Sequence, residues 1–386
     1  MQKTALLTLG RLPKALDVAT ALHGAGWRVI VAEPAKWHLS RVSRSVAASF
    51  TLTAPNDDRA AYLDDLLDII ARENVSLVVP VSEEAMHATL VMPRLPQGVR
   101  FFSLPHDAIA RLHDKLAFAR MAETFGLAVP QTHHLGTPEA ERLAAASDHI
   151  IKPVSTCSGQ GLEICKAGDP LPDAAARPVS VVQTFLGGAH KSTFSIAHEG
   201  RVIGTIVYRA AILSGTVAVA FERLDGELEI EGWVETFVAK ANHSGFIAFD
   251  LIDDSEGVPH AIECNPRITS GVHFVEPADL AGAVLDPASQ TALRAKPHRT
   301  MQQFYPSLTE TQTAAFRRDD FRRKLRVLAT AKEANFAWRD PLPLWLMPFT
   351  SWGIMKRAFV NGESFGEAST HDIGWYEEPP QPGEIG

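Results

Sequence analysis

The chain has 386 residues, of which 46% are hydrophobic and 21% are charged, so extensive disorder is excluded and a large core is expected. At roughly 150 residues per domain, this length predicts two or three domains. The formal net charge of −8 argues against a protein that depends mainly on attraction to nucleic acid phosphates.

The cysteines and the apolar tracts exclude further classes of protein. Only Cys157, Cys165 and Cys264 occur, without a C-x-x-C pair, so neither a disulfide framework nor a structural zinc site is expected. A reducing compartment fits this count, and we expect a cytoplasmic location. The longest apolar tract, around 342–355, is too short to span a bilayer and is broken by prolines.

Residues 1–110 read as a small doubly wound α/β domain. Short apolar strands are predicted at 4–9, 27–32, 77–81 and 101–104, and helices at 13–23 and 60–73. Gly10 follows the first strand, but Leu12 stands where a second glycine of G-x-G-x-x-G would be. We therefore favour a structural domain that shapes a substrate cleft over a dinucleotide-binding domain.

The rest of the chain changes character twice. A helical pattern covers 107–126, and residues 150–275 show mostly strand and turn signals. Beyond 285 the pattern becomes helical again, with an Arg-rich helix predicted near 313–333 and a Pro- and Trp-rich tail.

The strongest local signal is the sequence HAIECNPR at 260–267. Its alternation places Ile262 and Cys264 against a core, and Glu263 and Asn265 together on the opposite face of one strand. A carboxylate and an amide oxygen on one face are hard donors that suit Mg²⁺, which also keeps water and phosphate oxygens in its shell.

A second predicted strand, 245–252, adds another carboxylate to this face. The turn-rich sequence DDSEG separates it from the first strand, and a hairpin would bring Asp250 beside Glu263. Without a cation, two carboxylates so close would repel each other. The alternative is an ordinary amphipathic hairpin with a solvated acidic face.

A third signal is IIKPVSTCSGQG at 150–161. A strand delivers Lys152, which supplies a positive point charge, and the small residues after it let backbone N–H groups approach phosphate oxygens. Taken alone, such a loop is usually only a hairpin turn.

Together, in this order, these pieces resemble the ATP-grasp superfamily, in its carboxylate–amine ligase and carbamoyl-phosphate-synthetase type. The resemblance implies a mixed α/β and α+β fold in three parts. A Rossmann-like domain at 1–110 precedes a core at 111–285, whose two subdomains meet near 180 (111–180 and 181–285). A mostly helical extension occupies 286–386.

The resemblance also assigns roles to single residues. Lys115 and Lys152 would bind the nucleotide phosphates beneath a loop of small residues, and a hinge strand would hold adenine. Asp250, Glu263 and Asn265 would bind two Mg²⁺ ions, with Mn²⁺ as an alternative metal. Lys152 and Arg267 would be catalytic, with Arg267 stabilising the phosphoryl group in transfer. The loop is represented by Ser155, Ser158, Gly159 and Gly161, and the hinge by Gln183, Thr184, Phe185 and Leu186.

The sequence departs from the family's pattern at two positions. Thr184 stands where the family often has an acidic residue, and His190 stands where a glutamate commonly holds the ribose hydroxyls. A histidine there can still make one hydrogen bond to the ribose.

The activity that the resemblance implies is ATP-dependent joining of a small carboxylic or amino acid to an amine. The acid would pass through an acylphosphate, giving ADP and phosphate. An ATP-grasp carboxylase or kinase-type enzyme and a non-catalytic nucleotide-binding protein remain alternatives. Arg209 and Arg223 are candidates to bind the substrate carboxylate, or else ordinary surface arginines. The expected partners are small molecules and not nucleic acid, with a homodimer as an option.

The C-terminal hundred residues are the least readable part. Six of the ten residues 317–326 are basic, and Trp338, Trp345 and Trp352 follow at seven-residue spacing. A basic helix followed by aromatics could touch a membrane surface, but the prolines break this pattern. We favour a helical lid or a dimer contact.

Overall fold

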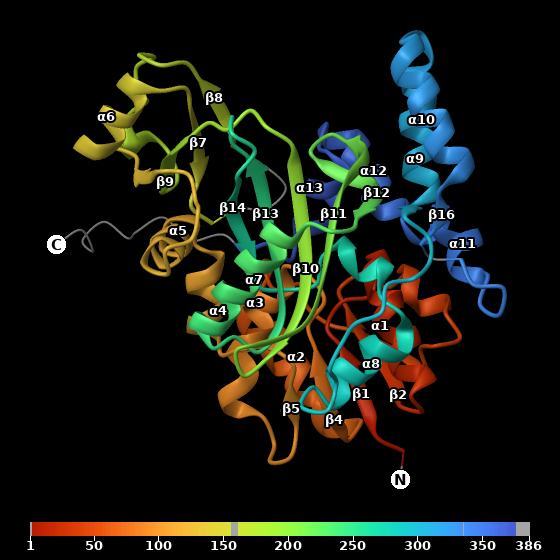
Figure 1. Cartoon of the computed structure of the whole chain (residues 1–386). Helices are drawn as coiled ribbons and strands as arrows, with labels where there is room; N and C mark the ends of the chain where they lie inside the picture. Colours follow the sequence, from red (N-terminus) through yellow and green to blue (C-terminus); the bar gives the residue numbers. More distant parts are fainter. Residues whose placement is uncertain (1, 156–160, 335, 376–386) are drawn as a thin grey trace.

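The computed structural model describes residues 2–155, 161–334 and 336–375. Its N-terminal part, red and orange in Figure 1, is a parallel five-stranded sheet with strand order β3-β2-β1-β4-β5. Its strands are β1 (Thr4–Leu7), β2 (Arg28–Glu33), β3 (Ala48–Thr51), β4 (Val75–Val79) and β5 (Arg100–Phe101). The helices between them are α1 (Pro13–Gly24), α2 (Arg59–Arg72) and α3 (Glu84–Ala88), with 3-10 turns η1 (Leu39–Val42) and η2 (Thr89–Arg94). The α/β prediction for this region is confirmed.

A helical link then leads to a second, four-stranded sheet with strand order β6-β9-β7-β8. The single helix predicted over 107–126 is in fact two helices, α4 (His106–His113) and α5 (Lys115–Thr124). They break at Asp114, whose carboxylate accepts hydrogen bonds from the first free N–H groups of α5. The sheet contains β6 (Thr132–His134), β7 (His149–Pro153), β8 (Glu163–Cys165) and β9 (Ser180–Thr184), with α6 (Pro138–Ala146) and η3 (Ala174–Ala176) alongside.

The largest sheet has seven strands in the order β14-β13-β10-β11-β12-β15-β16, and neighbours are antiparallel except β15 and β16. Its strands β10 to β14 form the green centre of Figure 1, with the four-stranded sheet above the β13–β14 end. Its first five strands in the chain are β10 (His190–His198), β11 (Arg201–Ser214), β12 (Val217–Leu224), β13 (Gly245–Asp253) and β14 (Pro259–Asn265).

Helix α7 (Leu228–Ala241) covers this sheet in a region that the sequence predicted to be mostly strands and turns. Gly232 and several β-branched and aromatic residues weaken its helix propensity. The spacing of its buried side chains is nevertheless helical: Ile230, Trp233, Val234, Phe237 and Val238. That spacing was the signal missed.

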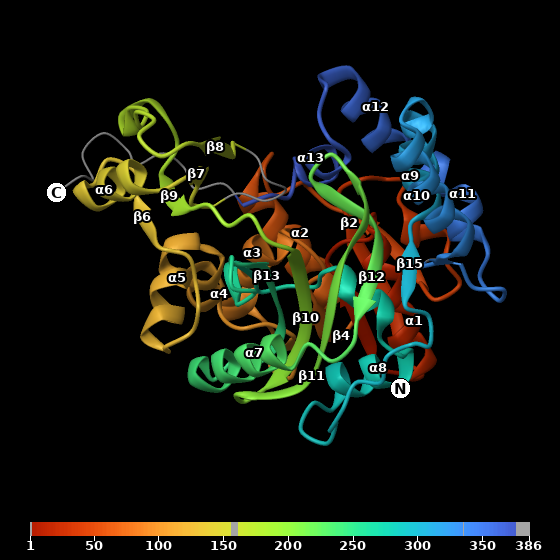
Figure 2. The same ribbon diagram turned by 45° about the horizontal axis from the view of Figure 1, so that its top comes forward.

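The C-terminal region is mostly helical, as predicted, but it also adds two strands to the largest sheet. β15 (Thr300–Gln302) pairs with β12, and β16 (Lys332–Glu333) pairs with β15. The remaining elements are η4 (Ser270–Phe274), α8 (Pro277–Leu285), α9 (Phe304–Thr313), η5 (Ala314–Phe316), α10 (Arg318–Thr330), α11 (Leu342–Thr350), α12 (Trp352–Asn361) and α13 (Phe365–Thr370). Figure 2 shows α9 to α13, in blue, on the side of the molecule that carries β12.

One continuous core holds the N-terminal sheet against the central sheet. Buried side chains of α1 such as Leu22 belong to the same cluster as Phe194 of β10 and Phe274 of η4. A buried ion-pair network ties the N-terminal sheet to the C-terminal extension instead, because Arg11 bonds both Glu33 of β2 and Asp372 beyond α13. The described helices include none that is long and apolar enough to cross a membrane.

Candidate active site

Four neighbouring strands place polar side chains in one row across the central sheet. The register aligns Tyr208 of β11 with Ser192 of β10, Ser192 with Asp250 of β13, and Asp250 with Glu263 of β14. All four residues line the same cavity of about 670 Å³. The predicted hairpin between Asp250 and Glu263 is therefore present.

A bulge corrects one prediction about this hairpin. Asp250 pairs with Glu263 but Leu251 pairs with Ala261, so Ile262 is an extra residue on β14. Ile262 consequently lines the cavity instead of facing the core, whereas Cys264 is buried as expected.

The two carboxylates and Asn265 form one hydrogen-bonded group. The Asn265 amide Nδ2 donates to Asp250 Oδ2 over 3.0 Å, and the Ser192 hydroxyl donates to the other Asp250 oxygen. Burial and the adjacent charge of Glu263 raise the pKa of Asp250 to about 6. Burial alone would also raise the pKa of Glu263, but the charges of Lys115 and Lys152 outweigh it and lower that pKa to about 2.

This group fits the chemistry of a magnesium site. Two like charges held side by side in a buried position call for a positive partner. The described residues contain no cluster of three or more His, Cys, Asp or Glu side chains able to hold a metal. A metal at Asp250, Glu263 and Asn265 would therefore need water or phosphate oxygens to complete its shell, as Mg²⁺ commonly does.

Two buried lysines face the acidic pair from other elements. Lys115 is the first residue of α5, so the cap at Asp114 fixes its position, and its Nζ lies 3.3 Å from the carbonyl oxygen of Val154. Lys152 lies on β7, and its Nζ donates to the Ile262 carbonyl over 3.2 Å. Burial lowers the pKa of Lys152 to about 8. Both line the cavity, so strands and helices distant in sequence bring these predicted residues together.

The predicted phosphate loop is only partly described. Ser155 is buried and Gly161 adopts a left-handed backbone with φ of +70°, while Ser158 and Gly159 lie outside the described residues. Leu162, immediately after the loop, lines the cavity.

The predicted hinge lies at the end of β9. The Gln183 side chain is buried and donates to Thr132, so it points into the protein. The Thr184 and Phe185 N–H groups donate to the carbonyls of Gln131 and Asp148, and Thr184, Phe185 and Leu186 are half-buried. None of the four hinge residues is among the cavity-lining residues, whereas exposed His190 is.

Arg267 connects this group to the N-terminal domain. Its guanidinium donates to Asn265 Oδ1 over 2.9 Å and forms a close ion pair with Glu83. Glu83 is buried, and the charge of Arg267 lowers its pKa although burial opposes this. Glu83 could not be predicted, because nothing nearby in the sequence marks it as the partner of a residue 184 positions later.

The position of Glu83 follows from the N-terminal sheet. Its strand order reverses between β1 and β4, and ligands of open α/β sheets bind beyond the carboxyl ends of strands at such a point. Lys14 after β1 and both Ser82 and Glu83 after β4 line the cavity there. The expectation that this domain shapes the cleft agrees with this geometry.

The comparisons with known proteins can now be set against this geometry. Residues 112–271 match a family model described as the ATP-grasp domain. The chain contains an ATP-grasp domain. A comparison with curated proteins found no match.

Solved structures share the fold of this chain at low identity. Biotin carboxylase from Campylobacter jejuni has a TM-score of 0.63 at 14% identity, over 76% of this chain and 74% of that one. N5-carboxyaminoimidazole synthetase from Staphylococcus aureus has a TM-score of 0.61 at 13% identity, over 83% and 87%. An L-amino acid ligase from Bacillus licheniformis has a TM-score of 0.56 at 16% identity, over 78% of each chain.

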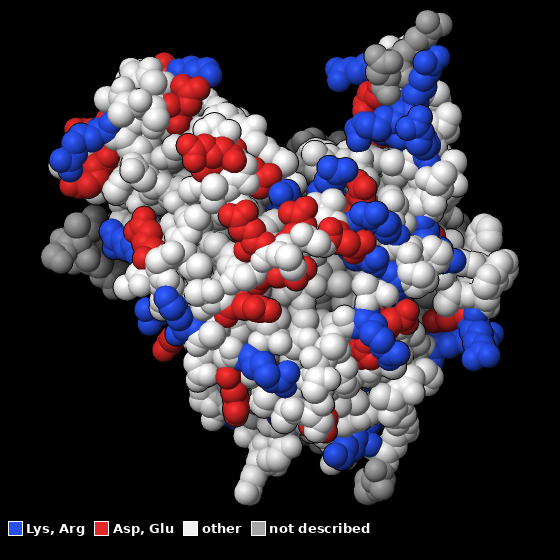
Figure 3. Space-filling model, in the orientation of Figure 1, with Lys and Arg blue, Asp and Glu red and all other residues white. Residues whose placement is uncertain are grey.

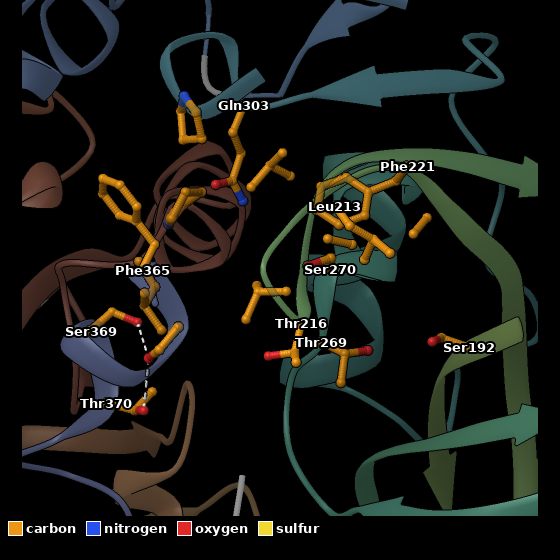
Figure 4. Close-up of a pocket in the computed structure, with 18 of the residues that line it drawn as sticks. Ser192, Leu213, Thr216, Phe221, Thr269, Ser270, Gln303, Phe365, Ser369 and Thr370 are labelled. Carbon is orange, nitrogen blue, oxygen red and sulfur yellow. Dashed lines mark hydrogen bonds between the residues drawn. The ribbon is translucent and has the colours of Figure 1, made fainter. Parts of the chain in front are cut away.

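The remainder of the ATP-grasp cavity lies between the central sheet and the C-terminal helices. Figure 4 shows Leu213 of β11, Phe221 of β12 and Thr216 of the connection between these strands. Phe365 and Thr370 of α13 lie opposite them, across an open space. The extension thus forms a wall of the cavity, while the lid and the dimer contact both stay predictions.

The two arginines proposed for substrate binding are not brought to this cavity. Arg209 is exposed and pairs with Glu222 on the neighbouring strand. Arg223 bonds Asp225 and the Lys296 carbonyl. Neither lines the cavity, because both side chains are engaged elsewhere, so the structure does not support this role for them.

Proposed function

We propose that this chain is an ATP-dependent ligase that activates a carboxylic acid as an acylphosphate and joins it to an amine, releasing ADP and phosphate. The observation that carries the proposal is the cavity in which Asp250 and Glu263 face Lys115, Lys152 and Arg267. Phosphoryl transfer to a carboxylate brings several negative charges together, and its catalysis is mainly positioning and charge stabilisation.

Each group has a role in this proposal. Lys115 and Lys152 hold the phosphate oxygens of ATP, and Arg267 stabilises the phosphoryl group and the acylphosphate. Asp250, Glu263 and Asn265 hold Mg²⁺, which when bound neutralises charge on the phosphates. Glu83 positions Arg267 through their ion pair.

The nucleotide base would lie between the four-stranded sheet and the central sheet. Ile150 of β7 and Ile252 and Ile262 of β13 and β14 line that part of the cavity and offer apolar surfaces to the two faces of adenine. His190 lies on the strand next to Ile252 and would contact the ribose.

The test is ADP release by the purified chain with MgATP and a panel of carboxylic acids and amines, followed by mass spectrometry of the products. The ligase requires ADP formation that depends on both acid and Mg²⁺, together with an amide product. Phosphorylated product without an amide would indicate the kinase-type enzyme. Release that requires bicarbonate would indicate the carboxylase.

ATP binding without turnover of any acid would indicate the non-catalytic alternative and contradict the ligase. The homodimer and the cytoplasmic location remain predictions. Light scattering of the pure chain tests the first by its mass, and fractionation of the cells that naturally produce the protein tests the second.

A further inference from the structure

The charged residues that line the cavity are confined to one end of it. Among the described residues that line it, every Lys, Arg, Asp and Glu comes from the N-terminal domain, α5, β7, β13, β14 or the segment just after β14: Lys14, Glu83, Lys115, Lys152, Asp250, Glu263 and Arg267. The part lined by β11, β12 and the C-terminal helices contributes no charged residue. One end is therefore suited to phosphates and metal, and the other is not.

The uncharged end is lined mostly by apolar side chains, with Gln303 and a few hydroxyl groups among them. On the sheet side they belong to β11 and β12, and opposite them to α9, α11, α12 and α13. They are Leu213, Val219 and Phe221 on the sheet, and Tyr305, Leu308, Met347, Ile354, Met355 and Phe365 on the helices.

The hydroxyl groups in this wall are partly used by the protein itself. Ser369 and Thr370 both donate to the carbonyl oxygen of Gly366, as Figure 4 shows. A hydroxyl that already donates within its own helix offers a ligand less polar surface. The wall formed by α13 is thus more apolar than its sequence indicates.

Apolar surface remains uncovered inside this end. Leu213 is 49% exposed although it lies at the end of a central strand, and Met355 of α12 is 36% exposed. Both line the cavity. An exposed apolar patch in a concave site marks a surface that a ligand covers.

We propose that the substrate acid carries a large apolar body, an alkyl or aryl group, which lies between β11–β12 and the C-terminal helices while its carboxylate reaches Arg267. This inference rests on the proposed function for the fate of the carboxylate. Bicarbonate or a short polar acid would leave the apolar end unfilled. The C-terminal extension is therefore the element that selects the substrate.

The test measures binding by calorimetry, with the full chain saturated with Mg²⁺ and a non-hydrolysable ATP analogue. The probes are acetate, butyrate, hexanoate and octanoate, with glutarate as a polar acid of intermediate length. We expect affinity to rise roughly fourfold per methylene, as for burial of a CH₂ group. Octanoate should bind at least tenfold more tightly than glutarate. Equal or tighter binding of glutarate would overturn the inference.

A matched pair of variants locates the apolar end. Leu213→Gln replaces a cavity residue, and Leu325→Gln replaces a residue of α10 with similar exposure, 44%, that does not line the cavity. Both positions are half-exposed, so neither change disturbs a core. We expect Leu213→Gln to weaken octanoate binding at least fivefold while leaving the ATP analogue unaffected, and Leu325→Gln to change neither. Equal octanoate affinities in the two variants would place the apolar body elsewhere.

Acid-dependent ADP release separates this inference from the proposed function. If octanoate binds as expected but no acid supports ADP release, the apolar site stands and the ligase is wrong. If acetate or glutarate supports release as well as octanoate does, the ligase stands and the apolar substrate is wrong.

Discussion

Asp17 of α1 is a buried carboxylate that ties the N-terminal domain to the segment around α8. Its oxygens lie 2.6 Å from His273 Nδ1 and 3.3 Å from Lys296 Nζ. Burial alone would raise the pKa of Asp17, but these two neighbours outweigh it and lower the pKa. The charged form is thus favoured by folding.

Asp17→Asn should lower the free energy of unfolding at pH 7 by about 2 kcal/mol, since a bond to a charged group is lost. A carboxyl whose folded pKa is depressed stabilises fully above its unfolded pKa of about 3.9 and loses this contribution as pH falls. Urea unfolding should therefore show the same gap between variant and wild type at pH 7 and pH 6, and a smaller gap below about pH 5. A gap that widens on acidification would contradict this account.

At the scale of elements, the connection from β9 to β10 depends on close packing against β13. A Cβ added at Gly188 would lie 2.0 Å from the Asp253 carbonyl oxygen, whereas one at Gly187 would meet nothing nearer than 3.8 Å. Gly188→Ala must therefore move the backbone between the hinge and His190. We expect a loss of about 1–3 kcal/mol of stability and a KM for ATP raised several-fold.

Gly187→Ala is the matched control and should change neither the melting temperature nor the KM for ATP appreciably. Thermal unfolding and ATP titration of the two variants check both statements. Similar behaviour of the pair would show that the approach of Gly188 to β13 does not fix the hinge.

Strand pairing explains what the sequence could predict at this scale. The two-residue alternation placed Glu263 and Asn265 on one face, and the short turn after Asp253 brought Asp250 beside them. The bulge at Ile262 was not predictable, because nothing in the local pattern marks one extra residue. Glu83 was missed for a related reason: its partner Arg267 is fixed by domain packing, which leaves no periodic signal. The pairing of Arg209 with Glu222 was not predictable either, because the sequence of one strand does not reveal an acid on its neighbour.

At the scale of the whole molecule, Arg11 joins the two ends of the chain. Its guanidinium bonds Glu33 and Asp372, and all three groups are largely buried. Asp372→Asn should cost about 1–3 kcal/mol and speed the trypsin digestion of the extension from α10 onward. Asp64→Asn, which breaks an exposed pair with Arg94, should cost under about 1 kcal/mol.

Urea unfolding and limited trypsin digestion followed by mass spectrometry check this comparison. Figure 3 shows why digestion is informative, since Lys and Arg gather at the upper right, over α10, and offer trypsin cleavage sites in the extension. Equal digestion of wild type and Asp372→Asn would mean that the Arg11 network does not hold the extension in place.

In the proposed function, Asp250 and Glu263, together with the lysines and the arginine that face them, activate a carboxylic acid with ATP. The most direct measurement is the rate of acid-dependent ADP release by wild type, Glu263→Gln and Glu256→Gln, the last being an exposed residue in the turn of the same hairpin. We predict that Glu263→Gln lowers the rate at least about 100-fold with unchanged circular dichroism, and that Glu256→Gln matches wild type. Undiminished, acid-dependent ADP release by Glu263→Gln would contradict the account.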